Sequence, residues 1–239
     1  MIKITIIRHG QASVLSDNYD QLSDLGKEQV RLLGEHFVKS NLHFDKLIQG
    51  PLFRHQQSTE GIISAYQDQN LAIPPIETME AFREHQGPRV VRAITPIVAQ
   101  SDEQLKQILA KATPTRKEKI WQHLKIYEYL TRLWVEGKVP PEAAQYQSWQ
   151  AFLDKVNTGI QNVYQNAEQG QHIAIVSSGG PVAASIGDVL GLTPMQTLEL
   201  SWMVENASFS EIHISSKRRS LRHYNCTGHL TEARLVTTI

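Results

Sequence analysis

Polar side chains follow three segments of this sequence that are rich in the β-branched and apolar residues typical of strands. Arg8 and His9 come directly after the first segment, and Arg54 comes shortly after the second. Ser178 is the second residue after the third. Because ligands of open α/β sheets bind beyond the carboxyl ends of the strands, we expect these four side chains to converge on one site if the strands are neighbours.

Two arginines beside one histidine are suited to binding a phosphate group. A guanidinium donates two parallel, charge-assisted hydrogen bonds to phosphate oxygens, which predicts this role for Arg8 and Arg54. The same positive charge disfavours an imidazolium. It should hold the pKa of His9 below its ordinary value of about 6.5 and keep a ring lone pair free for attack. The backbone N–H groups of Gly179 and Gly180, at the start of an expected helix, would add contacts to the anion.

The segments that must position these groups alternate between strand and helix patterns. Strand patterns occupy segments 2–7, 44–48, 173–176, 211–214 and 221–224. Helix patterns occupy segments 24–39, 52–65 and 181–190, the first capped by Ser23 and the last beginning at Pro181. This alternation predicts an α/β fold, with a mostly parallel central sheet flanked by helices.

Residues 89–166 follow a different pattern, which predicts several helices with breaks at Thr113-Pro114 and Val139-Pro140-Pro141. We therefore expect one domain over residues 1–239 with a helical insertion at about 89–166, which either covers the site or widens the domain. The core of the inserted helices is expected to contain Trp121, Tyr127, Leu130, Leu133 and Trp134.

The composition excludes several classes of protein. The chain has 24 basic and 24 acidic residues, so its net charge of zero gives no electrostatic reason to expect binding to nucleic acid or to an anionic membrane. The single cysteine, Cys226, excludes an intramolecular disulfide and fits a reducing compartment. The N-terminal apolar segment meets Arg8 too early to form a signal peptide, so we expect a cytoplasmic protein.

Four separated motifs carry a resemblance to one family. They are Ile6-Ile7-Arg8-His9-Gly10-Gln11, segment 50–58, Phe82-Arg83-Glu84-His85 and segment 224–230. Together they resemble the histidine phosphatase superfamily, in its phosphoglycerate mutase-like branch. The resemblance implies a phosphoglycerate mutase-like fold and a phosphohistidine that forms at His9 during turnover. It also implies that Arg54 is the second phosphate arginine and that Glu84 is the general acid.

Ser178 departs from the pattern of that family, whose second catalytic histidine falls at this position. A serine hydroxyl is neutral, reaches less far and donates only once. The loss of one preorganised donor to an oxyanion costs about 100- to 1,000-fold in rate, so we expect Ser178 to contact phosphate in an enzyme of reduced activity. Segment 8–13 resembles a subgroup of the family that carries Ser-Gly-Gly here. His55, His85 and His229 are alternatives for the missing group, but each is better interpreted as a surface or packing residue.

The sequence therefore predicts a metal-independent phosphatase acting on a small phosphate monoester. No metal or other cofactor is expected, because the arginines supply the charge that a divalent cation supplies elsewhere. Two alternatives stay open. One is a protein that binds a phosphorylated ligand without turnover, and the other is a phosphoglycerate mutase, against which Ser178 and the neutral composition both count. The expected partner is the small phosphate ester, with no nucleic acid and no membrane, while its identity and the oligomeric state stay open.

Overall fold

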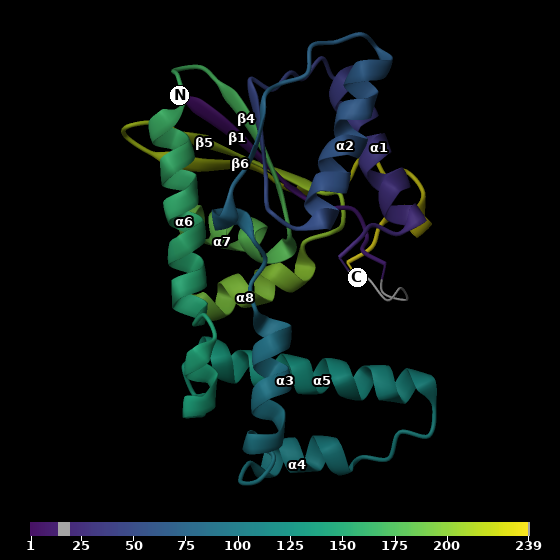
Figure 1. Ribbon diagram of the computed structural model, residues 1–239, viewed down its shortest axis with the longest axis vertical. Helices are drawn as coiled ribbons and strands as arrows, with labels where there is room; N and C mark the ends of the chain where they lie inside the picture. Colours follow the sequence, from purple (N-terminus) through teal and green to yellow (C-terminus); the bar gives the residue numbers. More distant parts are fainter. Residues whose placement is uncertain (14–19, 239) are drawn as a thin grey trace. The chain divides into compact units, whose positions relative to one another are not determined.

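The computed structural model describes residues 1–13 and 20–238 and contains two compact units (Figure 1). The first unit comprises Met1–Glu84 and Lys155–Ile239, and the second comprises His85–Asp154. Every residue predicted for the phosphate site belongs to the first unit.

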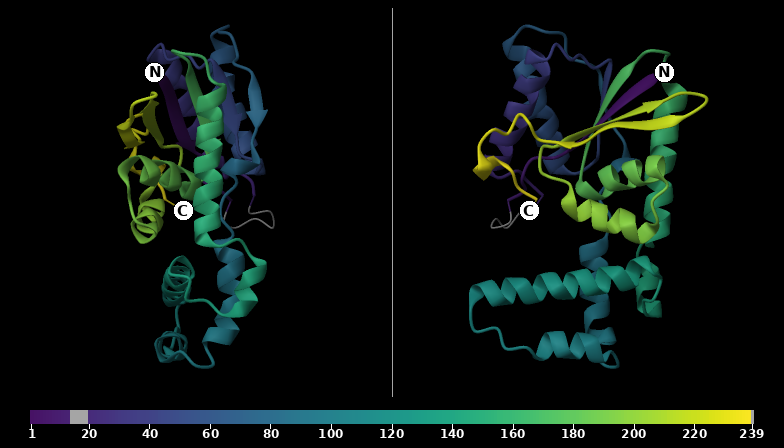
Figure 2. Two further views of the ribbon diagram at one scale, coloured as in Figure 1. Left: turned by 90° about the vertical axis from the view of Figure 1, so that its left-hand side faces the viewer. Right: turned by 180° about the vertical axis from the view of Figure 1, so that it is seen from behind.

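The described residues of the first unit form one six-stranded sheet, in the order β3-β2-β4-β1-β5-β6. The strands are β1 (Ile2–Arg8), β2 (Lys46–Gln49), β3 (Ile76–Thr78), β4 (His172–Ser177), β5 (Phe209–Ile214) and β6 (Arg219–Cys226). The pairs within β3-β2-β4-β1 are parallel, whereas β5 and β6 form an antiparallel hairpin at the edge of the sheet (Figure 2). The predicted α/β fold with a mostly parallel sheet is confirmed. β3 is not predicted from the sequence, because its side chains are all exposed and show no apolar alternation.

The register of the parallel strands brings the polar segments together. Arg8 at the end of β1 lies opposite Ser177 at the end of β4, and Gln49 at the end of β2 lies opposite Val176. The carboxyl ends of three adjacent strands are therefore nearly level. The residues that follow them leave the sheet at the same edge.

Helices cover the sheet of the first unit. They are α1 (Asp24–Lys39), α2 (Phe53–Asp68), α7 (Gly179–Leu190), α8 (Pro194–Met203) and the part of α6 (Trp149–Asn166) that starts at Lys155. α1 and α2 lie side by side (Figure 1) and bury Leu33, Phe37 and Ile62 in one cluster with Ile7 of β1 and Val176 of β4. Each such side chain contributes about 1.5–3 kcal/mol of burial free energy.

The start of α7 differs from the prediction, and α8 is absent from it. α7 begins at Gly179 rather than at Pro181, so both glycines lie within its first turn. α8 is not predicted, although Thr193 and Gln196 form a capping box around Pro194 and thus carry a sequence signal for its start. The predicted cap of α1 is confirmed, because the Ser23 side chain accepts the N–H of Gly26.

The second unit is helical. It contains α3 (Gly87–Val98), α4 (Glu103–Ala110), α5 (Arg116–Val135), a 3₁₀ segment (Pro141–Gln145) and residues 149–154 of α6, with breaks where the two proline segments predict them. Leu130 and Trp134 are buried as expected, but Trp121 is 56% exposed, so its assignment to the core is wrong. At about 100° per residue, Trp121 lies roughly half a turn around α5 from Leu130 and faces away from that core. None of the described helices is long and apolar enough to cross a membrane.

Candidate active site

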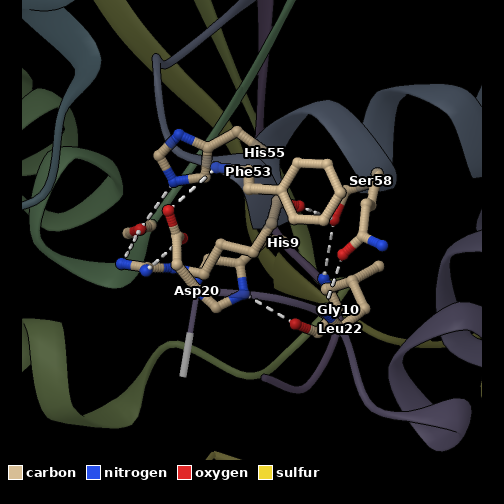
Figure 3. Close-up of polar contacts among 10 residues, drawn as sticks. His9, Gly10, Asp20, Leu22, Phe53, His55 and Ser58 are labelled. Carbon is tan, nitrogen blue, oxygen red and sulfur yellow. Dashed lines mark hydrogen bonds and ion pairs between the residues drawn. The ribbon is translucent and has the colours of Figure 1, made fainter. Parts of the chain in front are cut away.

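His9 is held at the end of β1 by two hydrogen bonds that fix its protonation. Its Nδ1 lies 2.6 Å from the Gly10 carbonyl oxygen, and its Nε2 lies 3.1 Å from Nε of Arg54 (Figure 3). A carbonyl only accepts and a guanidinium only donates, so Nδ1 carries the proton and Nε2 presents its lone pair. The ring is therefore a neutral imidazole whose Nε2 faces a cation.

The surroundings keep His9 in this neutral form. The side chain is only 6% exposed. Burial is the largest cause that holds the pKa of His9 well below its ordinary value, followed by the charges of Arg54 and Arg8. The Gly10 carbonyl opposes this shift without overcoming it. The predicted depression of this pKa has the predicted electrostatic cause, although burial is the larger one.

Arg54 joins the groups of the site from the first turn of α2. Besides its contact with His9, its Nη1 forms an ion pair with Asp20 at 2.8 Å, and its Nη2 donates to Oγ of Ser178 at 3.4 Å. The residue is 8% exposed. Ser58, one turn further along α2, accepts the N–H of Gly10 at 3.2 Å and so ties this helix to the end of β1. Of the four side chains predicted to converge, His9 and Ser178 are thus both joined to Arg54.

Arg8 lies beside the start of α7. Its Nη1 donates to the carbonyl of Val204, and its Nη2 donates to the carbonyl of Thr238 at 2.8 Å. A Cβ atom added to Gly179 would lie 3.8 Å from Nε of Arg8, which places this guanidinium against the first turn of α7. Arg8 therefore adds positive charge next to His9 while two backbone carbonyls hold its side chain.

Glu84 lies at the same helix start. Its Oε2 accepts the N–H of Gly180 at 3.2 Å, so the Gly180 N–H that the sequence assigns to an anion is engaged by a carboxylate in this structure. Arg83 forms its ion pair with Glu80 rather than with Glu84. Ser177, at the end of β4, donates to the Phe82 carbonyl at 2.7 Å and holds this segment against the sheet.

Two glycines are required by the close approach of chain segments around His9. A Cβ atom at Gly10 would lie 2.3 Å from the carbonyl oxygen of Gly26 on α1. A Cβ atom at Gly50 would lie 2.2 Å from Nδ1 of His55 and 2.5 Å from the carbonyl oxygen of Phe82. Both distances are far below van der Waals contact, so side chains at these positions would push the site apart.

Comparison with known protein families identifies the family of this chain. The sequence model of the histidine phosphatase superfamily (branch 1) matches residues 4–123 and 102–227, which include every predicted site residue. The chain belongs to the histidine phosphatase superfamily. The resemblance noted from the motifs is thereby confirmed, whereas no curated protein matches this chain.

Solved structures of the histidine phosphatase fold cover nearly the whole chain. The alpha-ribazole phosphatase of Shigella flexneri is 20% identical, over 94% of this chain and 96% of that chain, with a TM-score of 0.61. The phosphoglycerate mutase of Bacillus anthracis is 15% identical, over 96% and 95%, with a TM-score of 0.63. The phosphoserine phosphatase of Entamoeba histolytica, in complex with 3-phosphoglyceric acid, is 17% identical, over 96% and 100%, with a TM-score of 0.62. At such low identities these structures show the fold.

Within this histidine phosphatase fold, the three alternative histidines lie in three different surroundings. His85 packs in the second unit against Trp134, Trp149 and Phe152, as a packing residue would. His229 lies beside His36. His55 is fully buried and contacts Oγ of Ser178 through Nε2 at 2.7 Å, so its interpretation as a mere surface or packing residue does not hold.

Two members of the site escape prediction from the sequence, Asp20 and His55. Asp20 holds the guanidinium of Arg54 and also accepts the N–H of Phe53 at 3.0 Å, which serves the start of α2 in place of a local cap. No local pattern marks this carboxylate, because its partners come much later in the chain. The adjacent Arg54-His55 pair is the one available signal for His55.

No group of three or more histidine, cysteine, aspartate or glutamate side chains among the described residues is arranged to hold a metal ion. The arrangement around His9 offers a neutral nitrogen nucleophile, two guanidinium groups, a hydroxyl and a carboxyl group. These are the elements needed to bind a tetrahedral anion and to transfer its phosphoryl group.

Proposed function

We propose that the protein is a metal-independent phosphatase that hydrolyses a small phosphate monoester through a phosphohistidine at His9. The observation that carries this proposal is the pair of hydrogen bonds to the His9 ring, which places the proton on Nδ1 and turns the lone pair of Nε2 toward the guanidinium of Arg54. The matched superfamily and the phosphatases among the structural neighbours support the same class of reaction. The proposed partner is a small phosphate ester, met in the cytoplasm.

In the first step the guanidinium groups of Arg54 and Arg8 neutralise the phosphoryl oxygens. Nε2 of His9 attacks phosphorus, and a P–N bond forms as the ester P–O bond breaks. The electron pair leaves on the ester oxygen, which takes a proton from the carboxyl group of Glu84. Nδ1 of His9 keeps its proton and donates it to the Gly10 carbonyl, whose oxygen stabilises the positive charge that develops on the ring.

In the second step water replaces the histidine. The Glu84 carboxylate takes a proton from a water molecule as its oxygen attacks phosphorus. The P–N bond breaks, and its electron pair returns to Nε2 of His9. Inorganic phosphate leaves, Glu84 is again protonated, and the ring is neutral as at the start. The N–H of Gly180 keeps the Glu84 side chain at the helix start throughout.

Hydrolysis of an aryl phosphate by the native protein and by His9→Ala tests this function. The substitution should lower kcat/KM by at least about 1,000-fold, because it removes the nucleophile. Acid-labile phosphate bound to the native protein after rapid quenching should be absent from His9→Ala. His43→Ala, at an exposed histidine outside the site, is the matched control and should retain full activity. Equal rates for the native protein and His9→Ala would reject the mechanism.

A protein that binds phosphate without turnover is the second candidate, and the neutral Ser178 favours it. It predicts binding of inorganic phosphate that depends on Arg54, with no phosphohistidine at any pH. A phosphoglycerate mutase is the third. It requires interconversion of 3-phosphoglycerate and 2-phosphoglycerate that depends on a bisphosphoglycerate primer. The same quenched reactions, run with these substrates, separate the three.

A further inference from the structure

His55 is placed to control the hydroxyl of Ser178. Its Nε2 lies 2.7 Å from Oγ of Ser178, and its ring centroid lies 5.7 Å from that of His9. Both side chains are almost completely buried, and Ser178 does not cap its own helix. The hydroxyl is thus held by groups of the site rather than by the backbone of α7.

The hydrogen bonds around Oγ of Ser178 restrict where its proton can point. A hydroxyl has one hydrogen and two lone pairs. Nη2 of Arg54 can only donate, so it occupies one lone pair. If Nε2 of His55 donates as well, both lone pairs are filled, and the hydroxyl hydrogen is left for an acceptor in the site. If His55 accepts instead, Ser178 presents a lone pair, which repels a phosphoryl oxygen.

The surroundings of Nδ1 of His55 allow Nε2 either to donate to Ser178 or to accept from it. Burial, followed by the charge of Arg54, lowers the pKa of His55 to about 3, so the ring is neutral and has one proton to place. Nδ1 is buried without a well-aligned hydrogen-bond partner among the described residues, although the Gly50 carbonyl is near enough to raise the pKa. Because that carbonyl does not hold the proton on Nδ1 in good geometry, the proton can reside on Nε2.

We propose that His55 is a positioning residue that donates from Nε2 to Ser178 and thereby turns the hydroxyl proton of Ser178 toward a bound phosphoryl oxygen. The two residues then act as one neutral donor opposite Arg54. A phosphoryl oxygen in the site selects the tautomer that carries the proton on Nε2. This inference rests on the proposed function, because it assigns the contact that Ser178 makes with the phosphoryl group.

A double-mutant cycle on kcat/KM for an aryl phosphate tests the proposal. Ser178→Ala should lower kcat/KM by about 100-fold, the cost of one oxyanion donor. His55→Leu should lower it by about 10- to 100-fold. The double variant should be no slower than Ser178→Ala, because without the hydroxyl His55 has nothing left to position. Equal costs of His55→Leu with and without Ser178 would overturn the proposal, since a packing role acts in both backgrounds.

The conservative variants provide a second reading that does not depend on how well His55→Leu folds. In His55→Gln the amide nitrogen reaches about the place of Nε2 and can still donate to Ser178, whereas in His55→Asn it falls at the place of Nδ1. The Gln variant should retain most of the activity, and the Asn variant should lose as much as Ser178→Ala. Equal activity of the two variants would contradict the proposal. His229→Leu, outside the site, is the control and should leave turnover unchanged.

Failure of this inference can be told apart from failure of the proposed function. Turnover that depends on His9 but shows no coupling between His55 and Ser178 rejects the positioning role alone. Absence of both turnover and vanadate binding, measured by calorimetry on the native protein, rejects both. Quenched protein that carries phosphate on Ser178 instead of His9 also rejects the inference, because the hydroxyl would then be a nucleophile rather than a donor.

Discussion

The protein contains two pairs of histidines whose rings stand at the same separation. The ring centroids of His9 and His55 are 5.7 Å apart with the planes tilted by 34°, and those of His36 and His229 are 5.7 Å apart with a tilt of 31°. In both pairs one ring lowers the pKa of the other, and burial is the larger cause for the buried ring. Ring spacing and neutrality therefore do not distinguish the two regions.

The groups around each pair do distinguish them. Both ring nitrogens of His9 and the Nε2 of His55 are engaged by a carbonyl, a guanidinium and a hydroxyl. The second pair packs against the aromatic ring of Phe209. Neither nitrogen of His229 has a well-aligned hydrogen-bond partner among the described residues, although the Ala207 carbonyl is near enough to raise its pKa. A guanidinium and a well-aligned carbonyl engage the ring of His9, which suits this neutral imidazole to act as a nucleophile, whereas neither kind of contact is made by His229 among the described residues.

Removal of the Arg54 guanidinium should make the surroundings of His9 resemble those of His229, and we expect it to cause the largest loss of activity. Arg54→Met is expected to lower kcat/KM by about 1,000-fold, because it deletes both the donor to the phosphoryl group and the group that faces Nε2 of His9. Arg54→Lys keeps the positive charge without the forked geometry, so its kcat/KM should lie between those of the native protein and Arg54→Met. Steady-state kinetics with an aryl phosphate measure both. Arg31→Met, at a half-exposed arginine of α1 paired with Glu35, is the control. Full activity in Arg54→Met would show that the cation does not separate the two regions.

A glycine lies beside each histidine pair, and the two glycines differ in the space that a side chain would find there. In Gly50→Ala the new Cβ would lie 2.2 Å from Nδ1 of His55, whereas a Cβ at Gly228, next to His229, would meet no heavy atom within 4 Å. We expect Gly50→Ala to lower the free energy of unfolding by about 1–3 kcal/mol and to reduce turnover. Gly228→Ala should change stability by less than about 0.5 kcal/mol. Urea denaturation measures both, and equal losses would mean that His55 is not tightly confined.

Acid should act alike on one buried histidine of each pair, His55 and His229. The pKa of His55 falls to about 3 and that of His229 to about 4 in the folded protein, against about 6.5 in the unfolded chain. Between these values the unfolded chain binds more protons, so stability is complete above about pH 6.5 and is lost as the pH falls. Each of the two histidines should lower the free energy of unfolding at pH 5 by about 2 kcal/mol relative to its value above pH 6.5.

Urea denaturation between about pH 7.5 and pH 5 measures this acid sensitivity, because histidines in the unfolded chain titrate in this range. His55→Gln and His229→Gln should each flatten the dependence of unfolding free energy on pH, and the double variant should flatten it further. An unchanged dependence in either single variant would show that the histidine concerned is not held neutral by the fold.

The sequence predicts the centre of the site well, for a physical reason. Parallel strands place their carboxyl ends at one edge, so polar residues directly after β1 and β4 must meet, and Arg54 follows β2 closely enough to join them. These are consequences of local pattern plus sheet topology. The roles expected of His9, Arg8, Arg54, Glu84, Ser178 and Gly179 in catalysis and phosphate binding remain predictions.

The parts that escape prediction depend on contacts that local pattern does not encode. Asp20 reaches Arg54 across 34 positions in the chain, and His55 reaches Ser178 across 123. The engagement of the Gly180 N–H by Glu84 depends on where the segment after β3 runs. Trp121 was misplaced because hydrophobicity alone does not tell which side of a long helix meets a core.

The carbonyl of Thr238 holds one nitrogen of Arg8, and the carbonyl of Thr237 accepts the N–H of Asn206 at 2.7 Å. The position of the Arg8 guanidinium therefore depends on Thr237 and Thr238, whose side chains are not part of the hydrophobic core. Loss of the Thr238 carbonyl is expected to release Nη2 of Arg8 while the side chains of the core stay packed.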